Sequence, residues 1–244
     1  MPGCATAPAT SFMINKFTAP LRPLLVLGIL TLGWMPSGFG RAPVIGMPAK
    51  DLLASLPAAP AQWEMKESWA KNDFSDWLTT IAQREFAGPV PLDPTTKLPA
   101  PKLRPTVRFR ITDTGYWPIR IFRYQNFEPG TSEGVERKLL KDSPAFVVAK
   151  SDESGTSIRI SLLLRERFLV ELTTKNLEMK DAEAQLDRVG FGKLRAVPAN
   201  GETKLPQPMT LTCIDEMHPQ RTRTYQTFHM SLEEMEKARS IPPR

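Results

Sequence analysis

The sequence predicts an exported domain of the α+β class, with an antiparallel β-sheet of about six strands packed against helices. Three observations point to it: an apolar leader at the N-terminus, a series of segments in which apolar and polar residues alternate, and helical spacing after those segments. The chain of 244 residues has a net charge of +6, with basic residues spread along its length. Nucleic-acid-binding proteins concentrate this charge on one face, so no nucleic-acid partner is expected.

Residues 1–40 are predicted to form a removable signal peptide. Lys16 and Arg22 are the only charged residues in this segment, and they precede an apolar run of eleven residues at 24–34. A helix needs about 20 apolar residues to cross a bilayer, so this run is too short. Gly38 and Gly40 supply the small-x-small pattern of a cleavage site, which places the mature chain in the periplasm or outside the cell. An uncleaved anchor is the alternative.

Residues 41–61 are rich in Ala and Pro and are predicted to be a flexible lead-in. The fold is expected to begin at Gln62, because Trp63 and Met65 alternate with polar residues as in a half-buried strand. The segment 74–87 fits helical spacing and strand composition, and we favour a strand in its C-terminal half. Residues 88–105 contain six prolines and are therefore expected to form an exposed connection.

The strongest strand signal is the alternation of Val107, Phe109 and Ile111 with polar residues. A turn at Asp113-Thr114-Gly115 ends it. Further strands are predicted at 135–141, 145–149, 158–164 and 168–172, and the last three should form an antiparallel meander.

Residues 180–197 have helical spacing, interrupted by Gly190 and Gly192, and Asp187 could cap a second short helix. These elements define a domain at 62–198. The extension at 199–244 contains two expected closing strands, 209–214 and 224–229, and a capping box at Ser231 that predicts a final helix to about residue 239.

The segment Asp113-Thr114-Gly115 resembles the motif of aspartic proteases, in which two aspartates share one proton to activate water. The chain has one copy, so such a site would require a homodimer, and Tyr116 stands where that family has a small residue. The same residues are explained by a turn in which Asp113 accepts hydrogen bonds from its own backbone. A hydrolase using Asp113 is the alternative to a non-enzymatic domain.

No metal site is expected. The alternative is a site that uses Cys213 and His218, which lie near two acidic residues. Their spacing lacks the close Cys and His pairs of zinc sites, and a buried cysteine before a polar turn explains them as well. If Cys4 is removed with the leader, Cys213 is the only thiol and no intramolecular disulfide forms.

No nucleotide-binding, serine-hydrolase or metalloprotease motif occurs, so no cofactor is expected.

Aromatic and arginine residues alternate between positions 116 and 124, where they either form part of the core or make a binding surface. This segment is the best candidate for binding in the sequence. Its members are Tyr116, Trp117, Arg120, Arg123 and Tyr124.

Several segments in order are similar to exported bacterial proteins of unknown function, which resemble the α/β/α sandwich of the Mog1/PsbP type. They are 63–68, the run ending Gln83-Arg84-Glu85-Phe86, 109–115, 167–172 and the helix that follows. The resemblance covers residues 62–197 and implies a fold and a binding or scaffolding role, without catalytic residues. Together these features predict an envelope domain that binds a protein partner or ligand, of unknown identity, through its sheet or the loops at 116–130.

Overall fold

The computed structural model describes residues 41–74, 77–152 and 155–227. The signal peptide at 1–40 and the final helix at 231–239 lie outside these ranges. The described strands are β1 (Glu64–Phe74), β2 (Leu78–Ala87), β3 (Thr106–Asp113), β4 (Gly130–Ser132), β5 (Val135–Leu140), β6 (Ser143–Asp152), β7 (Gly155–Leu164), β8 (Phe168–Lys175), β9 (Met209–Asp215) and β10 (Arg223–Thr227).

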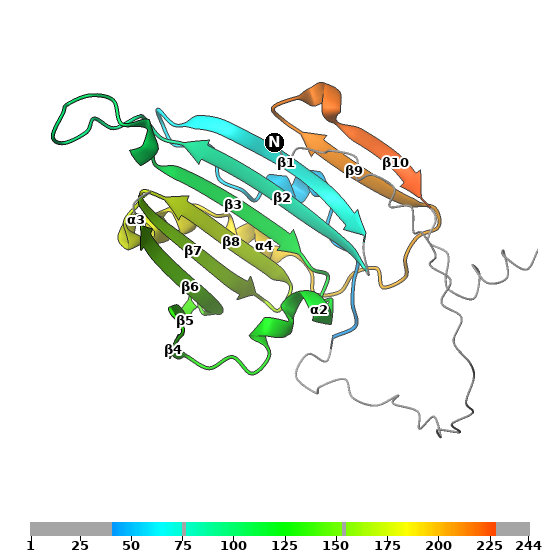
Figure 1. Cartoon of the computed structure of the whole chain (residues 1–244). Helices are drawn as coiled ribbons and strands as arrows, with labels where there is room; N and C mark the ends of the chain where they lie inside the picture. Colours follow the sequence, from blue (N-terminus) through cyan, green and yellow to red (C-terminus); the bar gives the residue numbers. More distant parts are fainter. Residues whose placement is uncertain (1–40, 75–76, 153–154, 228–244) are drawn as a thin grey trace, which may run out of the picture.

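All of these strands belong to one antiparallel sheet with the order β10-β9-β1-β2-β3-β8-β7-β6-β5-β4 (Figure 1). The predicted α+β class with about six strands is therefore wrong, and the fold is mainly β. The helices are short: α1 (Ala49–Leu53), α2 (Pro118–Ile121), α3 (Met179–Leu186) and α4 (Phe191–Ala196). Two strands of the 199–244 extension, β9 and β10, pair with the same sheet, and this pairing accounts for part of the additional width.

The sheet consists of two meanders that meet at the pairing of β3 with β8. Strands β1, β2 and β3 follow one another, and the chain then crosses to β4 and returns strand by strand to β8. At this junction Thr114 donates hydrogen bonds from its backbone N–H and its hydroxyl to the carbonyl of Arg167, at 3.0 and 2.7 Å. Residues 53 positions apart in the chain are thus fixed beside each other.

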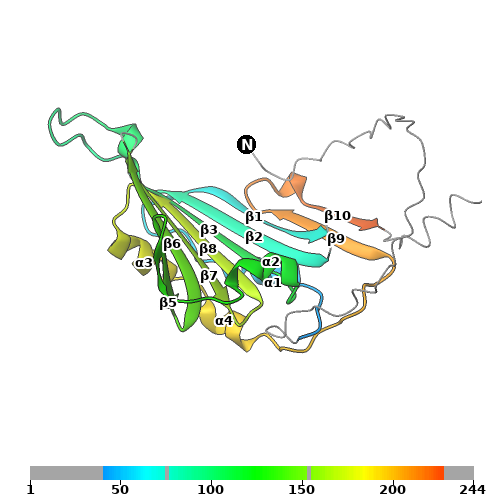
Figure 2. The same ribbon diagram turned by 60° about the horizontal axis from the view of Figure 1, so that its bottom comes forward.

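The main core lies on one face of the sheet, beneath α1, α3 and α4 (Figure 2). The alternation predicted for β3 is confirmed, because Val107, Phe109 and Ile111 are at most 1% exposed and point into this core. Their neighbours on β8 do the same, so burial of apolar side chains between sheet and helices is the main stabilising contribution. A smaller cluster lies on the opposite face, where Ile121 and Tyr124 pack on Leu163.

Residues 41–61 belong to the folded domain, contrary to the predicted lead-in. Leu52, Leu53 and Leu56 are at most 4% exposed and join the main core through α1. Pro48 precedes the helix, and the next apolar residues fall on one side of a short turn of helix. The Ala and Pro content concealed this element, because five helical residues leave too short a pattern to detect.

Most of the other secondary-structure predictions within the described residues agree with the structure. Strand β2 confirms the strand favoured within 74–87, and the proline-rich segment is an exposed connection in which Leu92 and Leu98 are more than half exposed. The predicted helix at 180–197 is divided into α3 and α4. Gly190, rather than Asp187, is the N-cap residue of α4. Within the described ranges, no helix is both long and apolar enough to cross a membrane.

Candidate ligand-binding site

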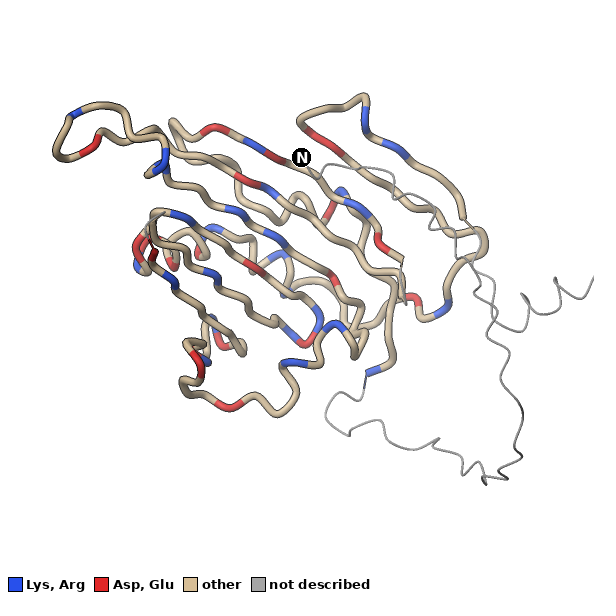
Figure 3. The backbone as a smooth tube through the Cα atoms, in the orientation of Figure 1, with Lys and Arg blue, Asp and Glu red and all other residues tan. Residues whose placement is uncertain are grey.

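The face of the sheet opposite α1, α3 and α4, here called the second face, carries rows of paired charged side chains. Arg108 on β3 contacts Glu85 on β2, and Arg159 on β7 contacts Glu171 on β8, each with N–O distances of 2.6 Å. Figure 3 shows acidic and basic positions distributed over these strands. Cross-strand pairs of opposite charge stabilise a solvated sheet face modestly.

Asp113 lies in the core side of the β3–β8 junction and forms a bidentate ion pair with Arg167, with distances of 2.7 and 2.8 Å. Its carboxylate also accepts hydrogen bonds from the backbone N–H groups of Met47 and Gly115. The side chain of Asp113 is 0% exposed and that of Arg167 is 5% exposed. Burial lowers the pKa of Arg167, but the hydrogen bonds and charge of Asp113 outweigh it, so the net pKa is raised.

A catalytic aspartate must reach water or substrate. Asp113 is enclosed, and each of its two carboxylate oxygens already accepts two hydrogen bonds. The Asp113–Gly115 turn interpretation matches the observed hydrogen bond from the Gly115 N–H at 3.0 Å. The geometry therefore favours a structural role for Asp113 over the hydrolase alternative.

The five predicted binding residues do not form one surface. Tyr116 is 3% exposed, and its hydroxyl accepts a hydrogen bond from Arg41. Trp117 stacks on Trp77 with ring centroids 5.6 Å apart, and Arg120 contacts Asp73.

Arg123 and Tyr124 reach the second face, where both contact Ser161 on β7. Tyr124 is 3% exposed, and its hydroxyl lies 2.8 Å from the hydroxyl of Ser161. Burial raises the pKa of Tyr124, so its phenol is neutral at physiological pH. The guanidinium of Arg123 hydrogen-bonds Ser161 and lies over the rings of Tyr124 and Phe146, at 5.0 and 5.3 Å from their centroids.

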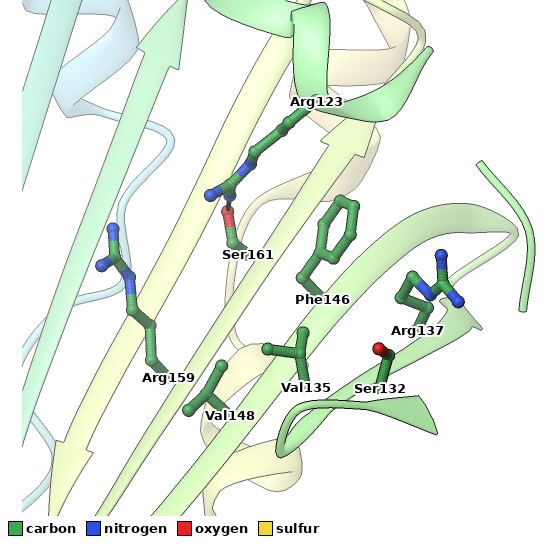
Figure 4. Close-up of a pocket in the computed structure, with 8 residues that line it drawn as sticks. All are labelled: Arg123, Ser132, Val135, Arg137, Phe146, Val148, Arg159 and Ser161. Carbon is green, nitrogen blue, oxygen red and sulfur yellow. Dashed lines mark hydrogen bonds between the residues drawn. The ribbon is translucent and has the colours of Figure 1, made fainter. Parts of the chain in front are cut away.

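A cavity of about 360 Å³ opens on this part of the second face, and we call it the β5–β7 cavity (Figure 4). Its lining residues are Arg123, Ser132, Val135, Arg137, Phe146, Val148, Arg159 and Ser161. Three of them are arginines and none is acidic.

The register of β5, β6 and β7 explains why these side chains meet. Phe146 on β6 is paired with Ser161 on β7 and with Arg137 on β5. In the adjacent row, Val148 is paired with Arg159 and with Val135. Phe146, Val148 and Val135 thus form an apolar strip. Arg137 on β5 borders it on one side and Arg159 on β7 on the other.

Sequence reasoning identified Arg123 but missed the other lining residues. The available signal was the outward row of β7, where Arg159 and Ser161 alternate with the core residues Ile158 and Ile160. This row could be recognised as a surface, but only the strand register shows which side chains lie next to it on β5 and β6.

A second cavity of about 440 Å³ borders Tyr124 and is lined by charges of both signs, among them Asp142, Arg165 and Glu166.

The structure does not bring Cys213 and His218 together as metal ligands. Cys213 is 8% exposed and is not a free thiol in the full chain. The expectation of a single thiol applies to a chain that has lost Cys4, and it stays a prediction. The ring of His218 lies 3.5 Å from Asp215, whose carboxylate accepts hydrogen bonds from the backbone N–H groups of Met217 and His218. No group of three or more His, Cys, Asp or Glu side chains suited to a metal occurs in the described part of the chain.

No protein-family model, curated protein or solved structure matches this chain. The resemblance to proteins of the Mog1/PsbP type therefore stays a prediction. The α/β/α sandwich that it implied is wrong, because the described strands form one antiparallel sheet and the helices are short.

Proposed function

We propose that the chain is a non-enzymatic binding protein of the cell envelope that holds a small molecule in the β5–β7 cavity. The observation that supports this most is the cavity itself. Its volume of about 360 Å³ falls within the range of about 300–1,000 Å³ typical of small-molecule sites. Its lining combines three apolar side chains with three arginines and two serines, so a bound molecule meets both apolar contacts and hydrogen-bonding groups.

The lining supports binding better than catalysis. It contains no His, Cys, Asp, Glu or Lys, the side chains that most often act as bases or nucleophiles. The hydroxyl of Ser161 is hydrogen-bonded to Tyr124 and Arg123, neither of which is a base at neutral pH. Export, the other part of the proposal, depends on the predicted signal peptide at 1–40.

The experiment is a fragment screen by saturation-transfer NMR with neutral, cationic and anionic compounds, performed on the purified chain and on Val148→Trp. A tryptophan at this position would fill the cavity, so we expect hits on the natural chain to be lost. Val90→Trp is the matched control, because Val90 is 42% exposed on the proline-rich connection. An absence of hits, or hits that survive Val148→Trp, would contradict the proposed function.

A further inference from the structure

We infer that the ligand of the β5–β7 cavity is an organic anion, a carboxylate or phosphate ester attached to a flat apolar body. This inference rests on the proposed function and specifies the class of ligand. Four features of the described residues support it: the charges, their incomplete neutralisation, the buried donor of Arg137 and the form of the apolar strip.

The charge of the lining is wholly positive. Arg123, Arg137 and Arg159 contribute three guanidinium groups, and no lining residue is acidic. Glu171 on β8 neutralises Arg159 from outside the cavity. Within the described ranges, neither Arg123 nor Arg137 forms an ion pair with Asp or Glu.

Arg137 has an unused hydrogen-bond donor. Its Nε is buried and has no acceptor among the described residues. A buried donor without a partner destabilises the fold, so such groups are uncommon in folded proteins. An oxyanion supplies the missing acceptor and the missing charge together, and guanidinium groups bind carboxylate and phosphate through paired hydrogen bonds.

The apolar strip indicates the rest of the ligand. The ring of Phe146 lies between Arg123 and Arg137, with Val135 and Val148 beside it (Figure 4). A flat apolar group can pack against the phenyl ring and the two valines while its acidic group contacts a flanking arginine. A cavity of about 360 Å³ accommodates a bicyclic compound of this kind.

The test uses four probes that separate charge from shape: 2-naphthoate, 2-naphthyl phosphate, the neutral 2-naphthamide and inorganic phosphate. Binding is measured by isothermal titration calorimetry at low and at physiological salt. We expect the two naphthyl anions to bind at least tenfold more tightly than the amide or inorganic phosphate, and the preferred anion distinguishes carboxylate from phosphate ligands. Their affinity should fall as salt rises, because exposed charges are screened.

Variants locate the binding. Arg137→Gln should weaken the better naphthyl anion about tenfold or more, because a hydrogen-bonded charge pair contributes about 1.5–3 kcal/mol and 1.4 kcal/mol is a factor of ten. Arg159→Gln should also weaken it, and Glu171→Gln should strengthen it by releasing Arg159. Arg108→Gln is the matched control, since Arg108 is a paired arginine on the same face outside the cavity. Each variant is first checked for an unchanged melting temperature.

The failure of this inference differs from the failure of the proposed function. If the amide binds as tightly as the naphthyl anions and Val148→Trp abolishes its binding, the cavity is a ligand site but not an anion site. If inorganic phosphate binds as tightly as the naphthyl anions, the apolar strip takes no part, and the inference is wrong. Equal weakening by Arg108→Gln and Arg137→Gln would show diffuse surface attraction and would also overturn it.

Discussion

The ion pair of Asp113 and Arg167 should contribute strongly to stability, because it joins the two meanders in a site without solvent. Asp113→Asn leaves the Arg167 charge buried without its partner. The NH2 group of the new amide would also face a hydrogen-bond donor instead of an acceptor. Breaking a buried pair in this way costs about 3–5 kcal/mol, a large part of the 5–15 kcal/mol that stabilises a typical domain. Arg167→Met should cost a similar amount, since it leaves a carboxylate with two backbone donors only.

The assay is urea unfolding followed by tryptophan fluorescence. With a slope of about 2–3 kcal/mol per molar urea, either single change should lower the midpoint by roughly 1–2.5 M. Combining Asp113→Asn with Arg167→Met removes both charges, so the double variant should be more stable than the sum of the single effects predicts, by about 2 kcal/mol. The control pair is Arg108→Gln with Glu85→Gln, exposed by 47% and 20%, which should cost about 0–1 kcal/mol. Additive effects, or a loss under 1 kcal/mol from either buried change, would refute the reasoning.

Three further predictions concern the fold. Leu52→Ala should lower the free energy of unfolding by about 2–5 kcal/mol because Leu52 is fully buried in the core, while Leu103→Ala, 41% exposed, should change it by about 0.5 kcal/mol or less. Gly115→Ala should cost at least about 2 kcal/mol in the same assay, because the φ of Gly115 is +57° and a Cβ there would lie 1.9 Å from the Val44 carbonyl oxygen. The control is Gly134→Ala, which should cost about 1–2 kcal/mol, because Gly134 has a φ of +76° but open space around it. The raised pKa of Tyr124 means that the folded state holds the phenolic proton more tightly than the unfolded state, so this contribution is complete below about pH 10 and is lost as pH rises above it. Denaturation measured between pH 9 and 11.5 should show a smaller alkaline loss for Tyr124→Phe, and no such change for the exposed Tyr225→Phe.

The sequence predicted most strands because their alternation is a local property. Val107, Phe109 and Ile111 show period two in the sequence, and the same residues line the core. Short helices give no comparable signal, so α1 was assigned to a flexible segment. The fold class was wrong for different reasons. The helices are only four to eight residues long. The pairing of β9 with β1, which brings β10 into the same sheet, is a long-range contact that no local pattern encodes.

The candidate site was predicted only in part, and the reason is again long-range pairing. Arg123 was selected because aromatic and basic residues alternate around it, yet its neighbours Tyr116 and Trp117 serve packing instead. Arg137 and Arg159 are 22 positions apart and look like ordinary outward residues of strands. Their grouping depends on the register of β5, β6 and β7.

The most direct test of the account is backbone NMR of the ¹⁵N-labelled chain during titration with 2-naphthoate. Binding in the β5–β7 cavity predicts saturable shift changes concentrated in β5, β6, β7 and residues 122–124, and their absence in Val148→Trp. Changes centred on β1, β9 and β10, or no saturable change at millimolar ligand, would contradict it.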